Sequence, residues 1–361
     1  MAIKNKKELV RQIEAYGLRH KLAELAKREV AKRPFRHLPK QFSKGILIGN
    51  IAIVPKKHTG TRYAYVIADM VEAKILHDDI NLKQYSWFNL GGNAKNFFKP
   101  KNYSDIINFL NRNKKLNQNI HILGAGSNTL FRDGGFDGTI IKLGKEFSNI
   151  KILSDGNLEV GAACLDKKVA NFALENSIKD FEFLSCIPGS IGGTVAMNSG
   201  CYEHEIANSI ISVDFLTLGG ELKTFKRDQI NFYYRGSDFG ETVIILNVKL
   251  KAIKGNKIEI QKKQNKFVEQ KKISQPSKIK TCGSTFKNPI NKKAWELIKQ
   301  SGCENLSIGG ARLSEKHCNF FMNNGDASSK DIEMLIEKVR EKVLRKTGIK
   351  LDLEIKIIGK K

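Results

Sequence analysis

Two glycine-rich turns constrain the fold of this chain more than any other feature of its sequence. The first lies in HILGAGSNTLF, where Gly124 and Gly126 directly follow an apolar run at 120–123 that reads as a buried strand. Glycine tolerates positive φ, and successive backbone N–H groups in such a turn can converge on an anion. Thr129 occupies the third glycine position, so the turn does not match the dinucleotide fingerprint. Alone, it indicates either a phosphate site or an ordinary turn.

The second turn lies in IPGSIGGTVAMNSG, where hydroxyl and amide side chains stand beside the glycines. Pro-Gly and Gly-Gly pairs mark turns in any protein, so a purely structural role stays open. Two such turns in one unit nevertheless favour a pyrophosphate ligand. The residues expected to bind it are Gly124, Ala125, Gly126, Ser127, Asn128, Pro188, Gly189, Ser190, Gly192, Gly193, Thr194 and Asn198.

From residue 81 onward, short strands alternate with helices, which is typical of an α+β protein. Strands are expected at 120–123, 139–143, 158–163, 210–218 and 243–250, and the lysine-rich segment 254–277 is either an exposed helix or a connection. A helix should begin at Ser328 or Ser329 and end at Gly348. The alternating pattern at 349–358 predicts a strand that points Glu354 away from its packed face, as a solvated charge.

The segment 1–80 carries no recognisable chemical motif. Apolar residues at helical spacing over 6–33 predict one or two basic amphipathic helices, and 46–54 and 62–71 read as the strands of a hairpin. At 361 residues, the chain is long enough for two or three compact units, and we place boundaries near positions 80, 145 and 252. No secretory signal or membrane span is expected.

The chain is strongly basic, with 62 Lys and Arg against 37 Asp and Glu and a net charge of +25. Such a charge makes nucleic acid the first partner to consider. The excess is spread along the chain without a basic-aromatic recognition element, so we expect no nucleic-acid function. A mutational bias toward Lys, Asn and Ile is an alternative source of the charge.

The six cysteines form no C-x-x-C pair, which favours reduced thiols without a metal site.

Three further segments concentrate unusual residues: FYYRGSDF around Arg235, CGSTFKNP around Ser284, and the last strand with Glu354. Each has an ordinary explanation, because Arg235 can form a surface ion pair and Ser284 can be a turn residue. Their spacing alone favours those explanations.

Taken together, these segments resemble the UDP-N-acetylenolpyruvoylglucosamine reductase family. The resemblance covers about 85–359 in consistent order. It runs through YSWFNLGGNAKNFF, LGAGSNTLFRDGGFDGTII, FEFLSCIPGSIGGTVAMNSG, YYRGSDF, GSTFKNP, IGGARLSEKHCNFFMN and LDLEIKIIG. Asp352 and Leu353 replace the Glu and Pro common in the family's final motif, and the segment 1–80 is longer than the family's short N-terminal segment.

The resemblance implies an α+β fold with two FAD-binding subdomains of the vanillyl-alcohol-oxidase type, 81–145 and 146–252, and a substrate domain at 253–361 whose last strand can pack back on the FAD domain. It also implies FAD as cofactor, NADPH as electron donor, a UDP-sugar substrate, a cytoplasmic location and a role in peptidoglycan precursor synthesis. Arg235, Ser284 and Glu354 match the family's catalytic residues, and Asn288 and His317 resemble its substrate contacts. The short spacing between Arg235 and Ser284 resembles the branch without an inserted tyrosine-bearing loop.

Two other functions stay open at this point. One is an oxidase or dehydrogenase that shares the flavin-binding fold and uses another donor. The other is a basic binding module that has lost catalysis and contacts RNA or an anionic membrane through the segment 1–45. Arg235, Ser284 and Glu354 are all present, which argues against lost catalysis. The segment 1–80 has no assigned role, and a partner-binding segment and a passive extension are equally compatible with it.

Overall fold

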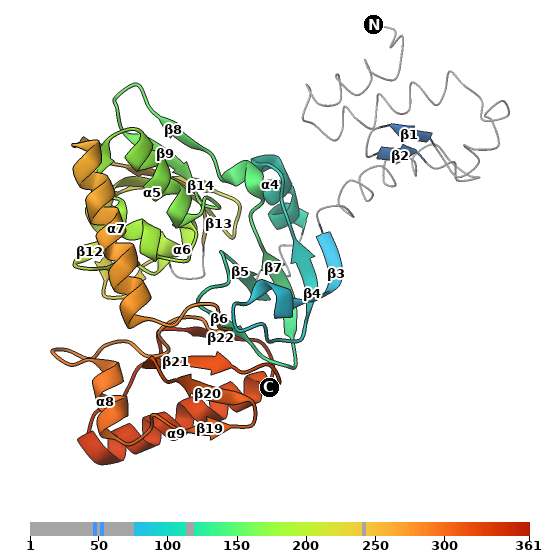
Figure 1. Cartoon of the computed structure of the whole chain (residues 1–361). Coiled ribbons are helices and arrows are strands. Elements are labelled where there is room, and N and C mark those ends of the chain that lie inside the picture. The colour runs from blue at the N-terminus through green and yellow to red at the C-terminus, as the bar shows by residue number, and fades with distance from the viewer. Residues whose placement is uncertain (1–45, 49–50, 54–75, 113–118, 240–242) are drawn as a thin grey trace, which may run out of the picture. The chain divides into compact units, whose positions relative to one another are not determined.

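The computed structural model describes residues 46–48, 51–53, 76–112, 119–239 and 243–361 (Figure 1). The chain divides into two compact units, Met1–His77 and Asp78–Lys361. In the first unit, β1 (Ile46–Ile48) and β2 (Ile51–Ile53) pair antiparallel. The single strand expected over 46–54 is therefore wrong, because its two halves pair with each other. The helices expected over 6–33 and the strand over 62–71 lie outside the described residues.

The second unit opens with a four-stranded sheet in the order β3-β4-β7-β5. Its strands are β3 (Leu76–Asn81), β4 (Asn93–Phe98), β7 (Phe136–Ile141) and β5 (Ile120–Ile122), and β7 runs parallel to both β4 and β5. Helix α4 (Tyr103–Arg112) follows β4. Apolar side chains such as Phe97, Leu123 and Ile140 form a buried cluster here. This packing fixes the end of β5, from which the first glycine turn leads into β6 (Thr129–Phe131).

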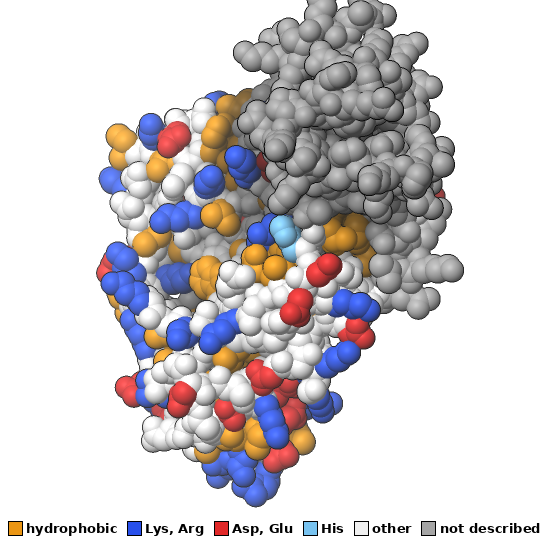
Figure 2. Space-filling model, turned by 90° about the vertical axis from the view of Figure 1, so that its right-hand side faces the viewer, with side chains coloured by type: hydrophobic (Ala, Val, Ile, Leu, Met, Phe, Trp, Pro, Cys, Tyr) orange, Lys and Arg blue, Asp and Glu red, His pale blue; other side chains and the backbone are white. Residues whose placement is uncertain are grey.

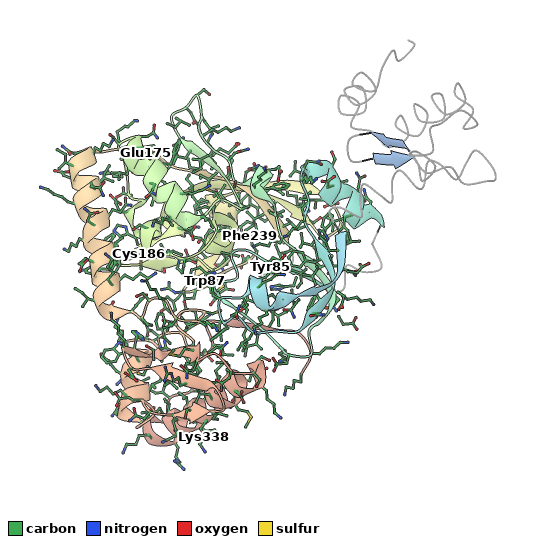
Figure 3. The ribbon with its side chains drawn as sticks, turned by 45° about the vertical axis from the view of Figure 1, so that its right-hand side comes forward. Tyr85, Trp87, Glu175, Cys186, Phe239 and Lys338 are labelled. Carbon is green, nitrogen blue, oxygen red and sulfur yellow. The ribbon has the colours of Figure 1, made fainter. Side chains whose placement is uncertain are left out.

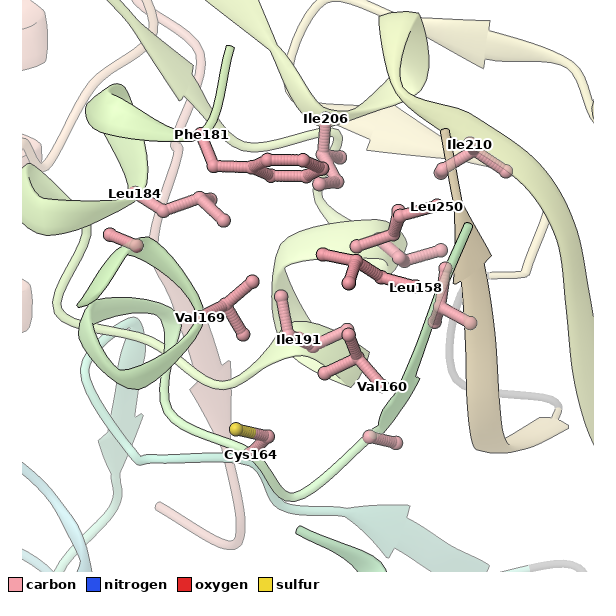
Figure 4. Close-up of a cluster of buried hydrophobic side chains, with 14 of the residues drawn as sticks. Leu158, Val160, Cys164, Val169, Phe181, Leu184, Ile191, Ile206, Ile210 and Leu250 are labelled. Carbon is pink, nitrogen blue, oxygen red and sulfur yellow. The ribbon is translucent and has the colours of Figure 1, made fainter. Parts of the chain in front are cut away.

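A five-stranded antiparallel sheet follows, in the order β14-β13-β17-β9-β8. Its strands are β8 (Ile150–Ile152), β9 (Leu158–Gly161), β13 (Ile210–Thr217), β14 (Leu222–Lys226) and β17 (Val243–Leu250). Helices α5 (Asp166–Glu175) and α6 (Ile191–Ala196) belong to the same core. Figure 4 shows Ile191 of α6 beside Val160 of β9 and Val169 of α5. The second glycine turn thus runs directly into a buried helix.

The segment 254–277 contains an 18-residue helix, α7 (Lys257–Ser274). Asn256 caps its N-terminus by accepting hydrogen bonds from the backbone N–H groups of Ile258 and Glu259. Ile260, Gln264 and Phe267 are buried, and Gln264 hydrogen-bonds to Asn171 of α5 at 3.2 Å. Of the two possibilities that the sequence left open, the structure therefore has a helix, attached by one face to the second sheet's core.

The C-terminal part forms a three-stranded antiparallel sheet, β19 (Ser307–Ile308), β20 (Ala311–Ser314) and β21 (His317–Asn323). Helices α8 (Ala294–Gln300) and α9 (Ser329–Thr347) complete its core. Ser328 and Asp331 form a capping box at the start of α9, and Gly348 ends the helix at φ +72°. The predicted boundaries of this helix are confirmed.

The end of the chain departs from the sequence prediction. The strand is limited to β22 (Lys356–Ile358), which pairs parallel with β6, next to the first glycine turn. Glu354 precedes this strand, and its N–H donates to the carbonyl of Thr285 at 2.8 Å. The apolar residues of 349–357 are buried or half-buried, and Lys350, Asp352 and Lys356 are exposed, so the expected alternation holds except at Glu354. The prediction of a solvated Glu354 is wrong, because its side chain is 21% exposed.

Arg132, just after β6, holds the end of the chain and helix α9 against β6. Its guanidinium donates two hydrogen bonds of 2.8 Å to Glu333 of α9 and a third of 3.1 Å to the carbonyl of Gly359. One position further along the chain, the carboxylate of Asp133 accepts from the N–H groups of Ser329 and Lys330. The C-terminal helix and the final strand are thus joined to the strand that carries the first glycine turn.

Several short elements complete the described part of the unit. The pairs are β10 (Ile178–Lys179) with β18 (Ile253–Lys254), β11 (Gly200–Cys201) with β12 (His204–Glu205), and β15 (Phe232–Tyr233) with β16 (Gly236–Ser237). Short 3-10 helices occupy Leu82–Tyr85, Lys145–Phe147, Glu182–Cys186, Ile206–Asn208 and Arg227–Gln229. All six cysteines are free thiols.

On the described surface seen in Figure 2, Lys and Arg side chains are scattered among uncharged and acidic ones. None of the helices in the described ranges is long and apolar enough to cross a membrane. Those ranges also contain no group of three or more His, Cys, Asp or Glu side chains that could hold a metal ion.

Candidate active site

The first glycine turn, 124–128, can be formed only with glycine at its centre. Gly126 has φ +72°, and a Cβ there would overlap the carbonyl oxygen of Tyr85. The Gly126 carbonyl in turn accepts from the N–H of Trp87 at 3.0 Å (Figure 3 labels Tyr85 and Trp87). The turn is therefore held against the segment between the first 3-10 helix and β4.

The second glycine turn lies against the first. A Cβ on Gly124 would be 2.9 Å from the hydroxyl oxygen of Ser190, so the absence of a side chain permits their close approach. Gly192 packs on Ala162, whose carbonyl accepts from the Gly192 N–H at 2.9 Å. The two turns, which are far apart in the sequence, thus form adjoining walls of one site.

A pocket opens between these turns. Five of the predicted cofactor-binding residues line it: Gly124, Ala125, Ser190, Gly192 and Gly193. The remaining lining side chains are mostly apolar and come from both sheets and the segments that follow them: Ile122, Leu123, Leu143, Ala162, Ala163, Leu165, Ala196, Val243 and Ile245. Among the described residues of the lining, Lys142 alone is charged. An apolar pocket with few polar groups and two glycine turns is suited to a large aromatic cofactor that carries phosphates.

Three of the other predicted cofactor residues use their side chains within the protein. The Asn128 amide donates to the carbonyl of Glu354 at 3.0 Å, and the Thr194 hydroxyl donates to the carboxyl of Asp166 at 2.7 Å. Asn198 is buried, and its amide donates to Glu205 at 2.9 Å and to the carbonyl of Tyr233 at 3.2 Å. These side chains position the turns and the neighbouring Arg235 segment, while Gly126, Ser127, Pro188 and Gly189 lie within the turns without lining the pocket.

The structure brings Arg235 and Glu354 into direct contact, although they lie 119 positions apart in the sequence. The Arg235 Nε donates to Glu354 Oε1 at 3.1 Å, and its Nη2 donates to the carbonyl of Gly200 at 3.1 Å. Glu205 lies 3.9 Å from Nη1, and the ring of Tyr234 is 4.7 Å from the guanidinium carbon. Arg235 adopts φ +55° in the turn between β15 and β16. Both the backbone and the side chain of Arg235 are therefore held in a specific geometry.

Burial raises the pKa of the Glu354 carboxyl above its ordinary value, although the positive charges of Arg235 and Lys287 oppose the shift. A carboxyl in this environment holds a proton more readily than one in water. The pair with Arg235 favours the ionised form of Glu354. An anion that binds to Arg235 would weaken this effect and so raise the pKa of Glu354 further.

Ser284 lies immediately before Thr285, whose carbonyl accepts from the backbone of Glu354. Ser284 also forms an isolated bridge with Phe320 of β21, which sets the segment at the edge of the C-terminal sheet. The backbone therefore brings Ser284 next to the Glu354 segment, and through it to Arg235.

The two predicted substrate contacts have local partners. Asn288 is exposed, and its Oδ1 accepts from the N–H of Ala294 at the start of α8 at 2.9 Å. His317 is half-buried at the start of β21, with its ring 4.8 Å from that of Phe320, the bridge partner of Ser284. Burial lowers the pKa of His317, so the neutral imidazole is favoured.

The sequence reasoning missed residues that support the site. Asp166 lies fully buried beneath the second turn, and Glu205 and Gly200 hold Arg235 from the β11–β12 hairpin. Lys142 lies at the pocket, within a segment that the sequence predicts only as a strand. Apart from Gly200, the last residue of IPGSIGGTVAMNSG, these positions lie outside the motifs named above, and the contacts of all of them are long-range.

Comparison with protein families defines the class of this chain. Residues 94–226 match a family model described as "FAD binding domain". Residues 275–358 match one described as "UDP-N-acetylenolpyruvoylglucosamine reductase, C-terminal domain". The fold and the glycine-lined pocket are thus those of an FAD-dependent oxidoreductase, and the α+β class with an FAD-binding part and a separate C-terminal domain is confirmed.

Individual relatives narrow the class to one family. The UDP-N-acetylenolpyruvoylglucosamine reductase of Pelagibacter ubique (strain HTCC1062) is 48% identical over 283 residues, which cover 78% of this chain and 93% of the relative. That of Rickettsia massiliae (strain Mtu5) is 45% identical over 282 residues, 78% of this chain and 95% of the relative. The crystal structure of the Thermus caldophilus enzyme superimposes with a TM-score of 0.69 at 28% identity, covering 78% of this chain and 98% of that one. The chain belongs to the UDP-N-acetylenolpyruvoylglucosamine reductase family.

Proposed function

We propose that this chain reduces UDP-N-acetylglucosamine enolpyruvate to UDP-N-acetylmuramate in peptidoglycan precursor synthesis, with NADPH as electron donor and FAD as cofactor. The observation that carries the proposal is the Arg235–Glu354 pair, with Ser284 on the segment that pairs with Glu354. Family membership supplies the reaction, and these three side chains have the chemistry that it needs.

The reaction adds a hydride to C3 of the enolpyruvyl group and a proton to C2. FAD, when bound, takes the hydride from NADPH and supplies it to the substrate. Negative charge then develops at C2 and spreads into the adjacent carboxylate. Arg235 carries a guanidinium held in place by Gly200 and Glu354, and its charge-assisted hydrogen bonds stabilise this enolate.

Ser284 is the proposed proton donor to C2. A free serine hydroxyl is a poor acid, so the alkoxide that it leaves needs stabilisation by neighbouring groups. Glu354 is suited to stabilise this alkoxide, because burial favours its protonated form while Arg235 holds the carboxyl in position. Asn288 and His317 are proposed to contact the substrate from the C-terminal domain.

The cofactor part of the proposal assigns FAD to subdomains 81–145 and 146–252 and the substrate to 253–361. All the predicted residues of the two glycine turns stay the proposed FAD contacts, with Gly124, Ala125, Ser190, Gly192 and Gly193 directly at the pocket. The UDP-sugar and NADPH are the proposed partners, without nucleic acid or membrane, in the cytoplasm where NADPH is available.

The flavin's absorbance tests this function in one cycle. Purified protein should be yellow, NADPH should bleach it without oxygen, and UDP-N-acetylglucosamine enolpyruvate should restore the colour. Reduction by a small alcohol or lactone in place of NADPH would favour an oxidase or dehydrogenase of the same fold. Failure of the enolpyruvyl substrate to reoxidise the flavin would reject the assignment.

A further inference from the structure

Lys142 lies at the end of β7, where the chain leaves the first sheet and enters the lining of the pocket. Its side chain is half-buried, and its ammonium group donates to the carbonyl of Gly124 in the first glycine turn. A lysine ammonium has three N–H donors. Within the described part of the chain, the Gly124 carbonyl is its one hydrogen-bond acceptor.

Among the residues that the structure describes, Lys142 has no counterion. None of the ion pairs between described residues includes Lys142, and the charged group that acts on it is another cation, Lys99. Burial, and secondarily Lys99, lowers the pKa of Lys142 to about 8. Lys99 itself has other contacts, since it donates to the Tyr85 hydroxyl at 3.1 Å and lies over the Tyr85 ring.

A buried cation without a partner destabilises a folded protein, because desolvation is not repaid by attraction to an anion. Such a group persists where a ligand supplies the missing charge. The pocket beside Lys142 is formed by both glycine turns, and the other described side chains of its lining are uncharged. The missing anion is therefore expected to come from the molecule that fills this pocket.

We propose that Lys142 is a cofactor-binding residue whose ammonium group pairs with the diphosphate of FAD. The diphosphate carries about two negative charges at neutral pH, and charge-assisted N–H···O hydrogen bonds are among the stronger ones in proteins. Arg235, Ser284 and Glu354 do not line this pocket, which separates Lys142 from the proposed site of the enolpyruvyl group. The inference rests on FAD as the cofactor and is independent of the proposed substrate.

The alternative is that Lys142 only braces the first turn through its bond to Gly124. The two roles predict opposite effects on the apoprotein. Removal of a bracing residue lowers the stability of the apoprotein, whereas removal of an uncompensated buried cation leaves it equal or higher.

The test has two measurements. Apoprotein is titrated with FAD while the quenching of flavin fluorescence reports binding, and the thermal unfolding of the same apoprotein is measured. The variants are Lys142→Met, Lys142→Gln and Lys142→Arg. Lys145→Met is the matched control, because Lys145 is a nearby exposed lysine. We expect Lys142→Met and Lys142→Gln to weaken FAD binding by roughly 10- to 100-fold, from the usual strength of a hydrogen bond to a charged group.

Lys142→Arg should keep most of the affinity, Lys145→Met should match the unmodified protein, and the Lys142→Met apoprotein should melt at the same temperature or higher. Unchanged FAD affinity in Lys142→Met would overturn the proposal. So would full affinity in Lys142→Gln, because a neutral contact would then suffice. Apoprotein of Lys142→Met that melts at a clearly lower temperature would assign the bracing role instead.

Discussion

Replacement of the buried Asp166 by asparagine should change the pH dependence of stability. Asp166 is fully buried at the first position of α5; Thr194 donates to one carboxyl oxygen, and the other oxygen has no hydrogen-bond partner among the described groups. Burial raises its pKa from 3.8 to about 7, against opposing hydrogen bonds from Thr194 and the backbone of Gly189. The folded protein therefore holds a proton that the unfolded chain releases.

The size of the effect follows from linkage. Because the pKa is higher in the folded state, stability falls as pH rises from about 4 to about 7 and is constant above that range. Each pKa unit corresponds to about 1.4 kcal/mol, so the free energy of unfolding loses about 3 kcal/mol between pH 5 and pH 8 through this one group. The asparagine that replaces Asp166 does not titrate, and Thr194 can still donate to its amide oxygen. Between pH 5 and pH 8, the free energy of unfolding of Asp166→Asn should thus rise by about 3 kcal/mol relative to that of the unmodified protein.

Urea unfolding at pH 5 and pH 8, with saturating FAD in every sample, measures this difference. Asp155→Asn is the matched control: hydrogen bonds from Lys249 and Asn157 lower the pKa of the exposed Asp155 to about 2. The stabilisation that Asp155 provides is fully present above about pH 4 and is lost only on acidification through its folded-state pKa. The difference in the free energy of unfolding between Asp155→Asn and the unmodified protein should therefore be the same at pH 5 and pH 8. If the difference in the free energy of unfolding between Asp166→Asn and the unmodified protein were also the same at pH 5 and pH 8, the reasoning would be refuted, and Asp166 would be ionised in the folded protein over this whole range.

Three further substitutions test separate parts of the structure. Gly126→Ala should destabilise the protein more than Gly156→Ala in urea unfolding, by about 1–3 kcal/mol, because both have positive φ but only Gly126 faces a backbone oxygen. Arg132→Met should cost about 2 kcal/mol, since it leaves the mostly buried Glu333 unpaired, whereas Lys299→Met, which breaks a pair between two exposed side chains, should cost well under about 1 kcal/mol. Glu354→Gln should lower turnover by about 100-fold or more while NADPH still bleaches the flavin at the normal rate; normal turnover would remove Glu354 from the mechanism.

Local patterns in the sequence predicted those elements whose signals are themselves local. The helix α9 is the clearest example, because its capping serine, its apolar face and Gly348 all lie within the one segment 328–348. The two glycine turns were also visible, since each is a contiguous segment. Their approach to within contact distance at Gly124 and Ser190 was not, because no local pattern specifies how two sheets pack.

Glu354 shows where periodicity misleads. Its neighbours alternate between apolar and polar residues, which predicts a half-exposed strand with Glu354 in water. The segment instead pairs with the backbone of Thr285 and Lys287, so that Glu354 lies mostly buried beside Arg235, and the regular strand begins only at Lys356. The family resemblance identified Glu354 by its motif, whereas its burial and its contact with Arg235 follow from tertiary packing.

The polar residues near the turns show a second limit. Asn128, Thr194 and Asn198 look like ligand contacts in the sequence, because each stands just beyond a glycine. In the structure their side chains hold Glu354, Asp166 and the Arg235 segment. Sequence proximity to a binding turn therefore does not show whether a polar side chain points to the ligand or bonds within the protein.

The central claim is that Arg235, Ser284 and Glu354 complete a reduction for which the glycine turns hold the cofactor. Its most direct test is the reoxidation step alone: protein reduced by NADPH without oxygen is mixed with UDP-N-acetylglucosamine enolpyruvate, and the return of flavin absorbance is followed over time. Ser284→Ala should be reduced by NADPH at the normal rate and then stay reduced, while Ser307→Ala, at an exposed position of β19, should reoxidise normally. Reoxidation of Ser284→Ala at the rate of the unmodified protein would contradict the account.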